Sequence, residues 1–194
     1  YQFEPPLSAW DENSKKAHWK NRPEGAPFFS VFNFVTTHEG QVRSRDPERL
    51  AQIEALGDLR HDPADVALPP YHADTPATRK DWAQYHDLIT LMDREVGEGL
   101  AELEAAGLTE DTIVWFWGDH GRGLTRCKRW LYESGTRVPL LVHVPEKYRA
   151  WVCPAAPDAL AAGINDHLVS FIDFAPTVLS LAGIAPPAHF QGQV

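Results

Sequence analysis

An acid and an imidazole stand side by side just after a strongly apolar run, and this pair carries the clearest chemical signal in the sequence. The segment 112-TIVWFW-117 has the composition of a buried strand, and Asp119 and His120 follow it. Together they offer two ligands for a divalent metal ion. Gly121 and Gly123 let the backbone approach a ligand closely. The alternative is that Asp119 caps a turn and His120 lies at the surface.

Four cationic side chains follow within one loop, in a chain whose formal net charge is −9. They are Arg122, Arg126, Lys128 and Arg129. A divalent ion with a nearby Lys and His can hold a tetrahedral oxyanion and stabilise the charge that develops when it is transferred. We expect Lys128 and Arg126 to point inward and Arg122 and Arg129 to lie in solvent. The alternative is a loop of solvated charges.

The elements that must position these residues alternate between strands and helices. Buried strands are predicted over 28–35, 112–117 and 137–144, and a short strand followed by a helix over 167–184. A helix is predicted over 76–107, and one helical turn around 47–56 within a long connection over 44–76. This alternation indicates an α/β layer fold with a mostly parallel sheet. Ligands gather at the carboxyl ends of parallel strands, where His38 follows the first strand and Asp119 and His120 the second.

The helix over 76–107 has the strongest pattern. Its apolar side chains recur in steps of three and four, at Trp82, Tyr85, Leu88, Met92, Val96, Leu100 and Leu103. Thr75 is the expected N-cap and Gly107 the expected stop. Gly97 and Gly99 each weaken the helix by up to about 1 kcal/mol relative to Ala, so a kink is expected there. At the C-terminal helix, Asp173 is expected to act as the cap.

Composition excludes several classes of protein. No apolar run approaches the roughly 20 residues that cross a bilayer, so no membrane span is expected. The net charge of −9 argues against a nucleic-acid partner. Cys127 and Cys153 form neither a disulfide framework nor a zinc motif.

Three segments together resemble the sulfatase branch of the alkaline-phosphatase superfamily. The first is 118-GDHGRGLTRCKRWLYESGTRVPL-140, and the others are 28-FFSVFNFVTTHEGQVR-43 and 169-VSFIDFAPTVLSLAGI-184. They occur in the order found in that family. The resemblance implies an alkaline-phosphatase-like α/β/α sandwich with a mostly parallel sheet. It also implies metal-dependent hydrolysis of sulfate esters, on small molecules or sulfated glycans. Two alternatives are a phosphonate or phosphodiester hydrolase of the same superfamily and a non-catalytic, degenerate member.

The resemblance also implies roles for individual residues. Asp119 matches a metal ligand, and His120 matches the neighbouring ligand position, which is often Asn in sulfatases. Lys128 matches the basic residue that contacts the sulfate and the leaving-group oxygen. His38 matches the histidine that binds sulfate or protonates the leaving group. Arg126 is expected to bind substrate. Ca²⁺ is the expected metal, and the imidazole of His120 also admits Mn²⁺, Fe²⁺ or Zn²⁺.

Part of the family's active site has no counterpart in this sequence. The nucleophile of sulfatases is a formylglycine made within Cys/Ser-x-Pro/Ala-x-Arg, and neither Cys127 nor Cys153 has that context. We expect this motif and a pair of aspartates upstream of Tyr1, and a C-terminal subdomain beyond Val194. Residues 1–194 are then the central and later part of one catalytic domain, incomplete at both ends, inactive alone and with an exposed sheet edge. The resemblance to the family implies a periplasmic or secreted location. The sequence does not indicate the oligomeric state.

Overall fold

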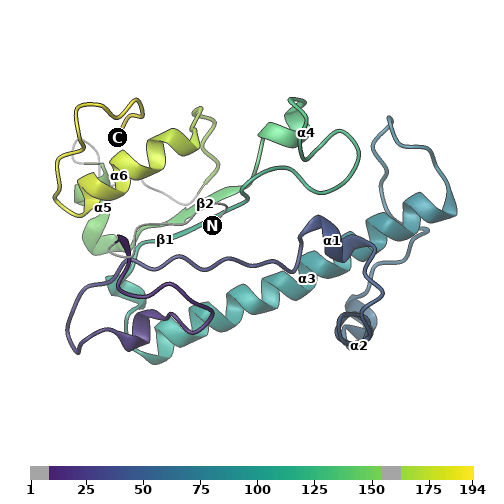
Figure 1. Ribbon diagram of the computed structural model, residues 1–194, viewed down its shortest axis with the longest axis horizontal. Coiled ribbons are helices and arrows are strands. Elements are labelled where there is room, and N and C mark those ends of the chain that lie inside the picture. Colours follow the sequence, from purple (N-terminus) through teal and green to yellow (C-terminus); the bar gives the residue numbers. More distant parts are fainter. Residues whose placement is uncertain (1–8, 154–162) are drawn as a thin grey trace.

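The computed structural model describes residues 9–153 and 163–194, in which one long helix runs beside several short elements (Figure 1). The α-helices are α1 (Glu39–Val42), α2 (Pro47–Glu54), α3 (Pro76–Ala105), α4 (Glu133–Thr136), α5 (Arg149–Val152) and α6 (Phe174–Leu181). The strands are β1 (Val114–Trp117) and β2 (Leu140–His143). Among the residues described, no helix is both long and apolar enough to cross a bilayer.

Helix α3 confirms the strongest sequence pattern. The Thr75 hydroxyl oxygen accepts the Thr78 N–H at 3.2 Å, and Gly107 after the helix end has a φ of 69°. The predicted kink at Gly97 and Gly99 is absent, because α3 runs uninterrupted over 30 residues. Nothing lies within 4 Å of a side-chain position at either glycine, so no neighbour forces the helix to bend.

The hydrophobic core lies between α1, α2 and the N-terminal half of α3. Its members are Val42, Ile53, Leu56, Val66, Trp82, Ala83, Leu88, Leu91 and Leu124. Val42 and Leu88 are fully buried, whereas Leu100 near the far end of α3 is 46% exposed. Leu124 belongs to the loop after β1, so the core attaches that loop to α1 and α3. Around 47–56, where one helical turn was expected, the structure forms the longer helix α2 of eight residues.

The strand predicted over 28–35 does not form. This segment has no ladder hydrogen bonds, and Phe29 and Val35 are 61% and 64% exposed. Its apolar rings make local contacts instead, such as the stacking of Phe28 on Trp19 with centroids 5.5 Å apart. An apolar sequence becomes a strand only when another strand satisfies its backbone groups, and the described residues supply none for this segment.

The observed sheet has two strands, and they are antiparallel. Val114 pairs with His143 and Trp117 with Leu140, so the mostly parallel sheet is not confirmed. The chain reverses direction after β1, so that β2 begins beside the end of β1. The Gly118 N–H donates to the Pro139 carbonyl and continues the ladder by one hydrogen bond. All four β2 residues are exposed, contrary to the predicted burial.

Helix α6 covers part of β1. The Phe174 ring meets Trp115 and Trp117 edge-on, with centroids 5.1 and 5.4 Å apart. The short strand predicted before α6 is replaced by a 3₁₀ turn, Phe171–Asp173. The Asp173 carboxylate accepts N–H groups from Gln193 and Ser170, and these hydrogen bonds lower its pKa. It therefore caps this turn and not α6 itself.

Candidate active site

His38 and Lys128 lie 90 residues apart in the sequence and meet in the structure. The Lys128 Nζ is 3.4 Å from the His38 Nε2. His38 is the N-cap of α1, and its Nδ1 accepts the Gly40 N–H at 3.2 Å. Because Nδ1 accepts, the hydrogen of the neutral ring is on Nε2. Two hydrogen-bond donors therefore face the same space, which is the arrangement that an oxyanion can accept from.

Glu39 holds the cations beside His38. Its carboxylate accepts hydrogen bonds from Arg129 at 2.5 and 3.0 Å, and its Oε1 lies 3.7 Å from the Lys128 Nζ. Hydrogen bonding by Arg129 is the main cause that lowers the Glu39 pKa, and the charges of Arg129, Lys128 and His38 lower it further. Arg129 stays largely exposed, as predicted, but it is tied to α1.

The loop that carries Lys128 is folded against itself and against α1. We call residues 118–136 the cationic loop. Within it, the Gly121 N–H donates to the Gly135 carbonyl at 3.0 Å, and the Lys128 N–H donates to the Arg122 carbonyl at 3.0 Å. At Gly123 an added Cβ would overlap the Cβ of Glu39 and lie 2.7 Å from its Cα. The absence of a side chain at Gly123 is thus what allows the loop to reach α1.

Asp119 and His120 open the cationic loop with two metal-binding groups. The His120 Nδ1 lies 2.8 Å from the Gly121 carbonyl, which can only accept, so Nδ1 carries the hydrogen. The lone pair of the neutral ring is then on Nε2, 3.5 Å from the Asp119 carboxylate. Two electron-pair donors face each other, and a cation between them would relieve their repulsion. In the described part of the chain, no group of three His, Cys, Asp or Glu residues could hold a metal ion.

Comparison with known proteins identifies the family. A family profile described as Sulfatase matches residues 12–184. The chain belongs to the sulfatase family. A sulfatase of this family has the alkaline-phosphatase type of α/β fold. The motifs quoted from the sequence therefore identified the family correctly.

The similar proteins include sulfatases of several kinds. The chain is 37% identical over 220 residues to an ulvan-active sulfatase of Formosa agariphila, an alignment that covers all of this chain and 35% of that protein. It is 35% identical over 129 residues to the human N-sulphoglucosamine sulphohydrolase, covering 66% of this chain and 24% of the relative. An endo-4-O-sulfatase of Bacteroides thetaiotaomicron is 28% identical over 177 residues, covering 86% and 31%. The chain thus spans about a third of the length of these relatives or less.

The two remaining arginines of the cationic loop pack against aromatic rings. The Arg122 guanidinium lies 4.8 Å from the Trp82 ring centroid, and its Nε is buried, so the prediction that Arg122 lies in solvent is wrong. Arg126 lies 5.1 Å from the Tyr71 ring and 5.2 Å from the Tyr132 ring, and it is exposed, so the prediction that it points inward is wrong. The attraction between a cation and an aromatic face explains both positions. The sequence contains no periodic signal that links Tyr71 to the loop.

Histidines on and near α3 border the buried ring of Trp82. The His72 and His86 rings meet it edge-on, with centroids 5.5 and 5.9 Å away. Burial is the main cause that lowers the pKa of both histidines, and the charge of Arg122 lowers both further. A hydrogen bond to the Thr125 backbone raises the His72 pKa and partly offsets this lowering. The charge of Asp87 does the same for the His86 pKa.

These lowered pKa values predict that stability falls as the pH drops below 6.5. Unfolded histidines titrate near 6.5, whereas the folded rings resist protonation, so the unfolded state binds more protons between the two pKa values. The melting temperature should decrease from pH 7.5 to 5, and His86→Asn should flatten that decrease. His189→Asn, at an exposed position, is the matched control. Identical pH profiles for wild type and His86→Asn would contradict this explanation.

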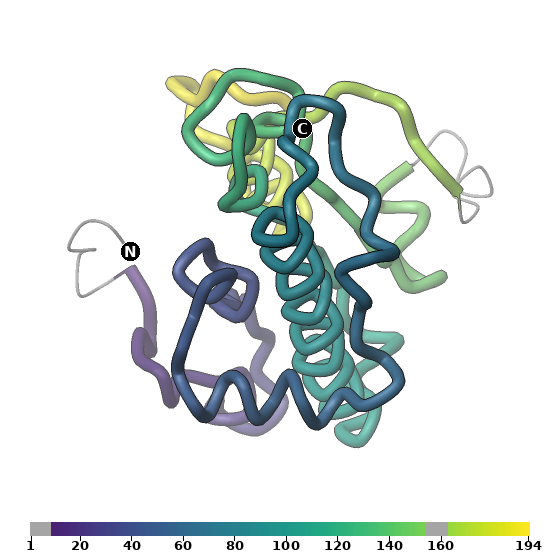
Figure 2. The backbone as a smooth tube through the Cα atoms, turned by 90° about the vertical axis from the view of Figure 1, so that its right-hand side faces the viewer, coloured from purple at the N-terminus to yellow at the C-terminus, as the bar shows by residue number. Residues whose placement is uncertain are grey.

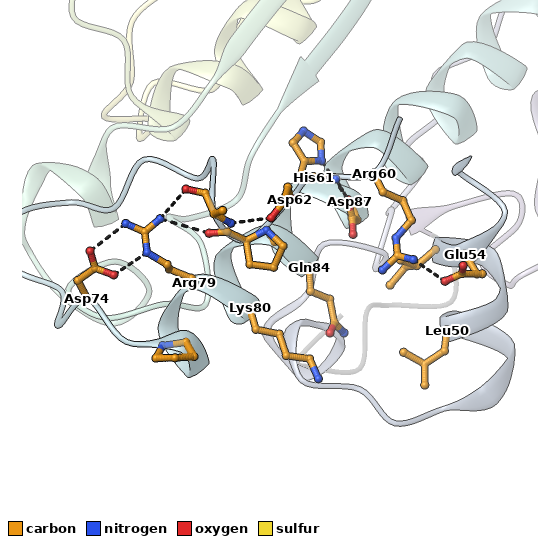
Figure 3. A pocket seen from close by; sticks show the side chains of 15 residues that line it. Leu50, Glu54, Arg60, His61, Asp62, Asp74, Arg79, Lys80, Gln84 and Asp87 are labelled. Atoms are coloured by element: carbon orange, nitrogen blue, oxygen red, sulfur yellow. Dashed lines mark hydrogen bonds and ion pairs between the residues drawn. The ribbon is translucent and has the colours of Figure 1, made fainter. Parts of the chain in front are cut away.

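A hollow lies between α2 and α3, away from the cationic loop (Figure 3). Its volume is about 940 Å³. Its charged groups are largely paired with one another, as Arg60 with Glu54 and His61 with Asp87. Side chains that are already paired with opposite charges bind an anion weakly. We therefore place the candidate active site at His38 and Lys128.

Proposed function

We propose that the protein containing this chain hydrolyses sulfate esters of sulfated sugars. The observation that carries the proposal is the 3.4 Å approach of the Lys128 Nζ to the His38 Nε2. The printed names of the relatives agree, because they include an ulvan-active sulfatase and an N-sulphoglucosamine sulphohydrolase. The substrate is a small-molecule or glycan sulfate ester.

The two side chains have separate tasks in the proposed reaction. Lys128 binds a sulfate oxygen and balances the negative charge that shifts onto the leaving group. His38 donates the Nε2 proton to the bridging oxygen as the sulfur–oxygen bond breaks, so that the sugar leaves as an alcohol. Glu39 keeps the Lys128 ammonium near His38. We assign Arg43 no part in this, because it pairs with Asp81.

Asp119 and His120 fit as part of the metal site. They would hold the ion together with ligands from outside the described residues, since a divalent ion usually needs at least four. When bound, the metal would act as a Lewis acid on the sulfate. Ca²⁺ is the first candidate from the family, and the imidazole of His120 also admits Mn²⁺, Fe²⁺ and Zn²⁺. We expect the formylglycine nucleophile in sequence that precedes Tyr1.

We further propose that residues 1–194 form the central and later part of one catalytic domain. The unpaired apolar segment 28–35 supports this, because a strand from elsewhere in the domain would satisfy its backbone and cover its side chains. A mostly parallel sheet would result. We expect export to the periplasm or secretion from the cell, because the chain belongs to the sulfatase family.

Assay of the full-length protein tests the proposed activity. We expect turnover of 4-nitrophenyl sulfate and of sulfated sugars, abolished by a metal chelator and restored by the metal. Faster turnover of phenylphosphonate esters or bis(4-nitrophenyl) phosphate would favour the second candidate, a phosphonate or phosphodiester hydrolase, for which His120 in place of Asn is the favouring observation. Turnover of none of these compounds would favour a non-catalytic member.

A further inference from the structure

Arg126 is held in an unusual conformation at the edge of the proposed active site. Its guanidinium lies over the rings of both Tyr71 and Tyr132, at 5.1 and 5.2 Å from their centroids. Its φ is 63°, in the left-handed region that a residue with a side chain seldom adopts. Strain of this kind persists only where the surrounding structure imposes it, and it concentrates at functional sites.

The charge of Arg126 is unpaired within the described part of the chain. No carboxylate there lies within ion-pair distance of it, whereas Arg79 and Arg129 each bind a carboxylate through two nitrogen atoms. The residue is exposed, so its donors can be reached from solvent. A planar guanidinium with free donors is suited to binding a carboxylate or sulfate in a bidentate manner.

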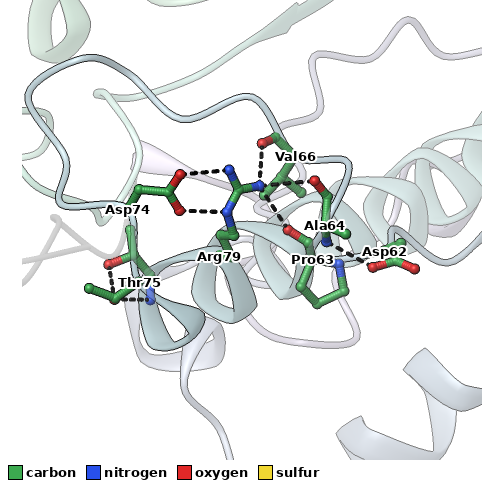
Figure 4. A network of polar contacts seen from close by, with 8 residues as sticks. Asp62, Pro63, Ala64, Val66, Asp74, Thr75 and Arg79 are labelled. Carbon is green, nitrogen blue, oxygen red and sulfur yellow. Dashed lines mark hydrogen bonds and ion pairs between the residues drawn. The ribbon is translucent and has the colours of Figure 1, made fainter.

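Hydrogen bonds hold the backbone on either side of Tyr71 and around Tyr132. Figure 4 shows Arg79 on α3 joined to Asp74 and to the carbonyls of the 63–66 segment, which fastens the chain on either side of Tyr71. On the other side, the Tyr132 carbonyl accepts the Gly135 N–H at 2.8 Å. The Ser134 hydroxyl donates to the Arg126 carbonyl at 2.7 Å. The guanidinium is therefore positioned before any ligand arrives, which lowers the entropy cost of binding.

Arg126 is also close to the residues proposed to hold the sulfate. It precedes Lys128 by two positions, so their Cα atoms are at most about 7 Å apart. Both side chains therefore extend from the same short stretch of the loop, so a short glycan can bridge their charged groups. An anion at Arg126 and a sulfate at Lys128 can therefore belong to neighbouring positions of one glycan.

We propose that Arg126, clamped by Tyr71 and Tyr132, binds a second anionic group of the same glycan whose sulfate ester is held by His38 and Lys128. The group is a carboxylate or a second sulfate, which present the same chemistry to a guanidinium. This inference rests on the proposed function. The second contact, at Arg126, makes the protein selective for polyanionic glycans over singly sulfated sugars.

Calorimetric binding to the full-length protein tests the inference without requiring turnover. The probes are three disaccharides with the same sulfated sugar, joined to a uronic acid, to a second sulfated sugar or to a neutral sugar. We expect the wild type to bind at least one doubly charged probe about 10- to 100-fold more tightly than the neutral-neighbour probe. The probe preferred identifies the second group. Arg126→Gln should reduce this preference to near unity, and Arg94→Gln, at an exposed position on α3, should keep it.

A further variant separates a binding role from a structural one. Arg126→Gly adopts a φ of 63° without steric cost, so its melting temperature should be at least that of wild type while the preference is lost. Equal affinity of the wild type for all three probes, or a preference that survives in Arg126→Gln and Arg126→Gly, would overturn the inference. Preference without hydrolysis of any probe would uphold it and reject the proposed activity instead.

Discussion

Replacement of Lys128 or His38 by Ala in the full-length protein is expected to lower kcat for a sulfated sugar by about 100- to 10,000-fold. Each change removes one of the two donors that meet at 3.4 Å. Without Lys128 the charge on the sulfate and the leaving oxygen is less stabilised. Without His38 the sugar must leave as an alkoxide. Steady-state kinetics at saturating substrate give the comparison, and Lys15→Ala at an exposed position serves as the control.

The leaving group distinguishes the two roles. A 4-nitrophenolate is stable without a proton, so His38→Ala should impair 4-nitrophenyl sulfate much less than a sugar sulfate. Lys128→Ala should impair both substrates to a similar extent, because every sulfate carries the charge that Lys128 balances. Wild-type kcat in either variant would reject the assignment of that residue, and equal losses on both substrates in His38→Ala would reject its role as proton donor.

The sequence predicted well what depends on local pattern. The periodic apolar face and capping residues placed α3 from Pro76 to Ala105, close to the expected 76–107. The motifs around His38 and Lys128 identified the family and named a pair of residues that the structure brings together. The helix prediction held because helix periodicity and N-capping are properties of a few neighbouring residues. The pair His38 and Lys128 came instead from the family resemblance, because these residues lie 90 positions apart.

The predictions that failed depend on partners distant in sequence. The segment 28–35 has the composition of a buried strand, but pairing is decided by another strand, and none of the described residues provides one. Arg122 was expected in solvent because four cations would not all converge on one ligand, yet its guanidinium packs on the Trp82 ring, 40 positions earlier in the chain. The contact of Arg126 with Tyr71 likewise depends on how the cationic loop docks, because Tyr71 lies outside that loop.

The docking of that loop depends on Gly123, and Gly123→Ala is expected to lower kcat by about 100-fold. The added methyl would overlap the Cβ of Glu39 and lie 2.7 Å from its Cα, so backbone must move. A displacement of the loop on the order of 1 Å carries Lys128 away from His38, and such misplacement strongly slows reactions that depend on alignment. Overpacking should also destabilise the protein by about 1–3 kcal/mol, seen as a lower denaturation midpoint in urea.

Gly97→Ala is the matched control for this substitution. It makes the same chemical change, but nothing lies within 4 Å of its Cβ position, and it lies in the interior of α3. It should leave kcat unchanged and raise stability by up to about 1 kcal/mol, because Ala favours the helix over Gly. A Gly123→Ala protein with wild-type kcat would show that the close approach of the loop to α1 is not needed for the reaction. A loss confined to Gly123→Ala would instead show that catalysis depends on the contact that sets the distance between Lys128 and His38.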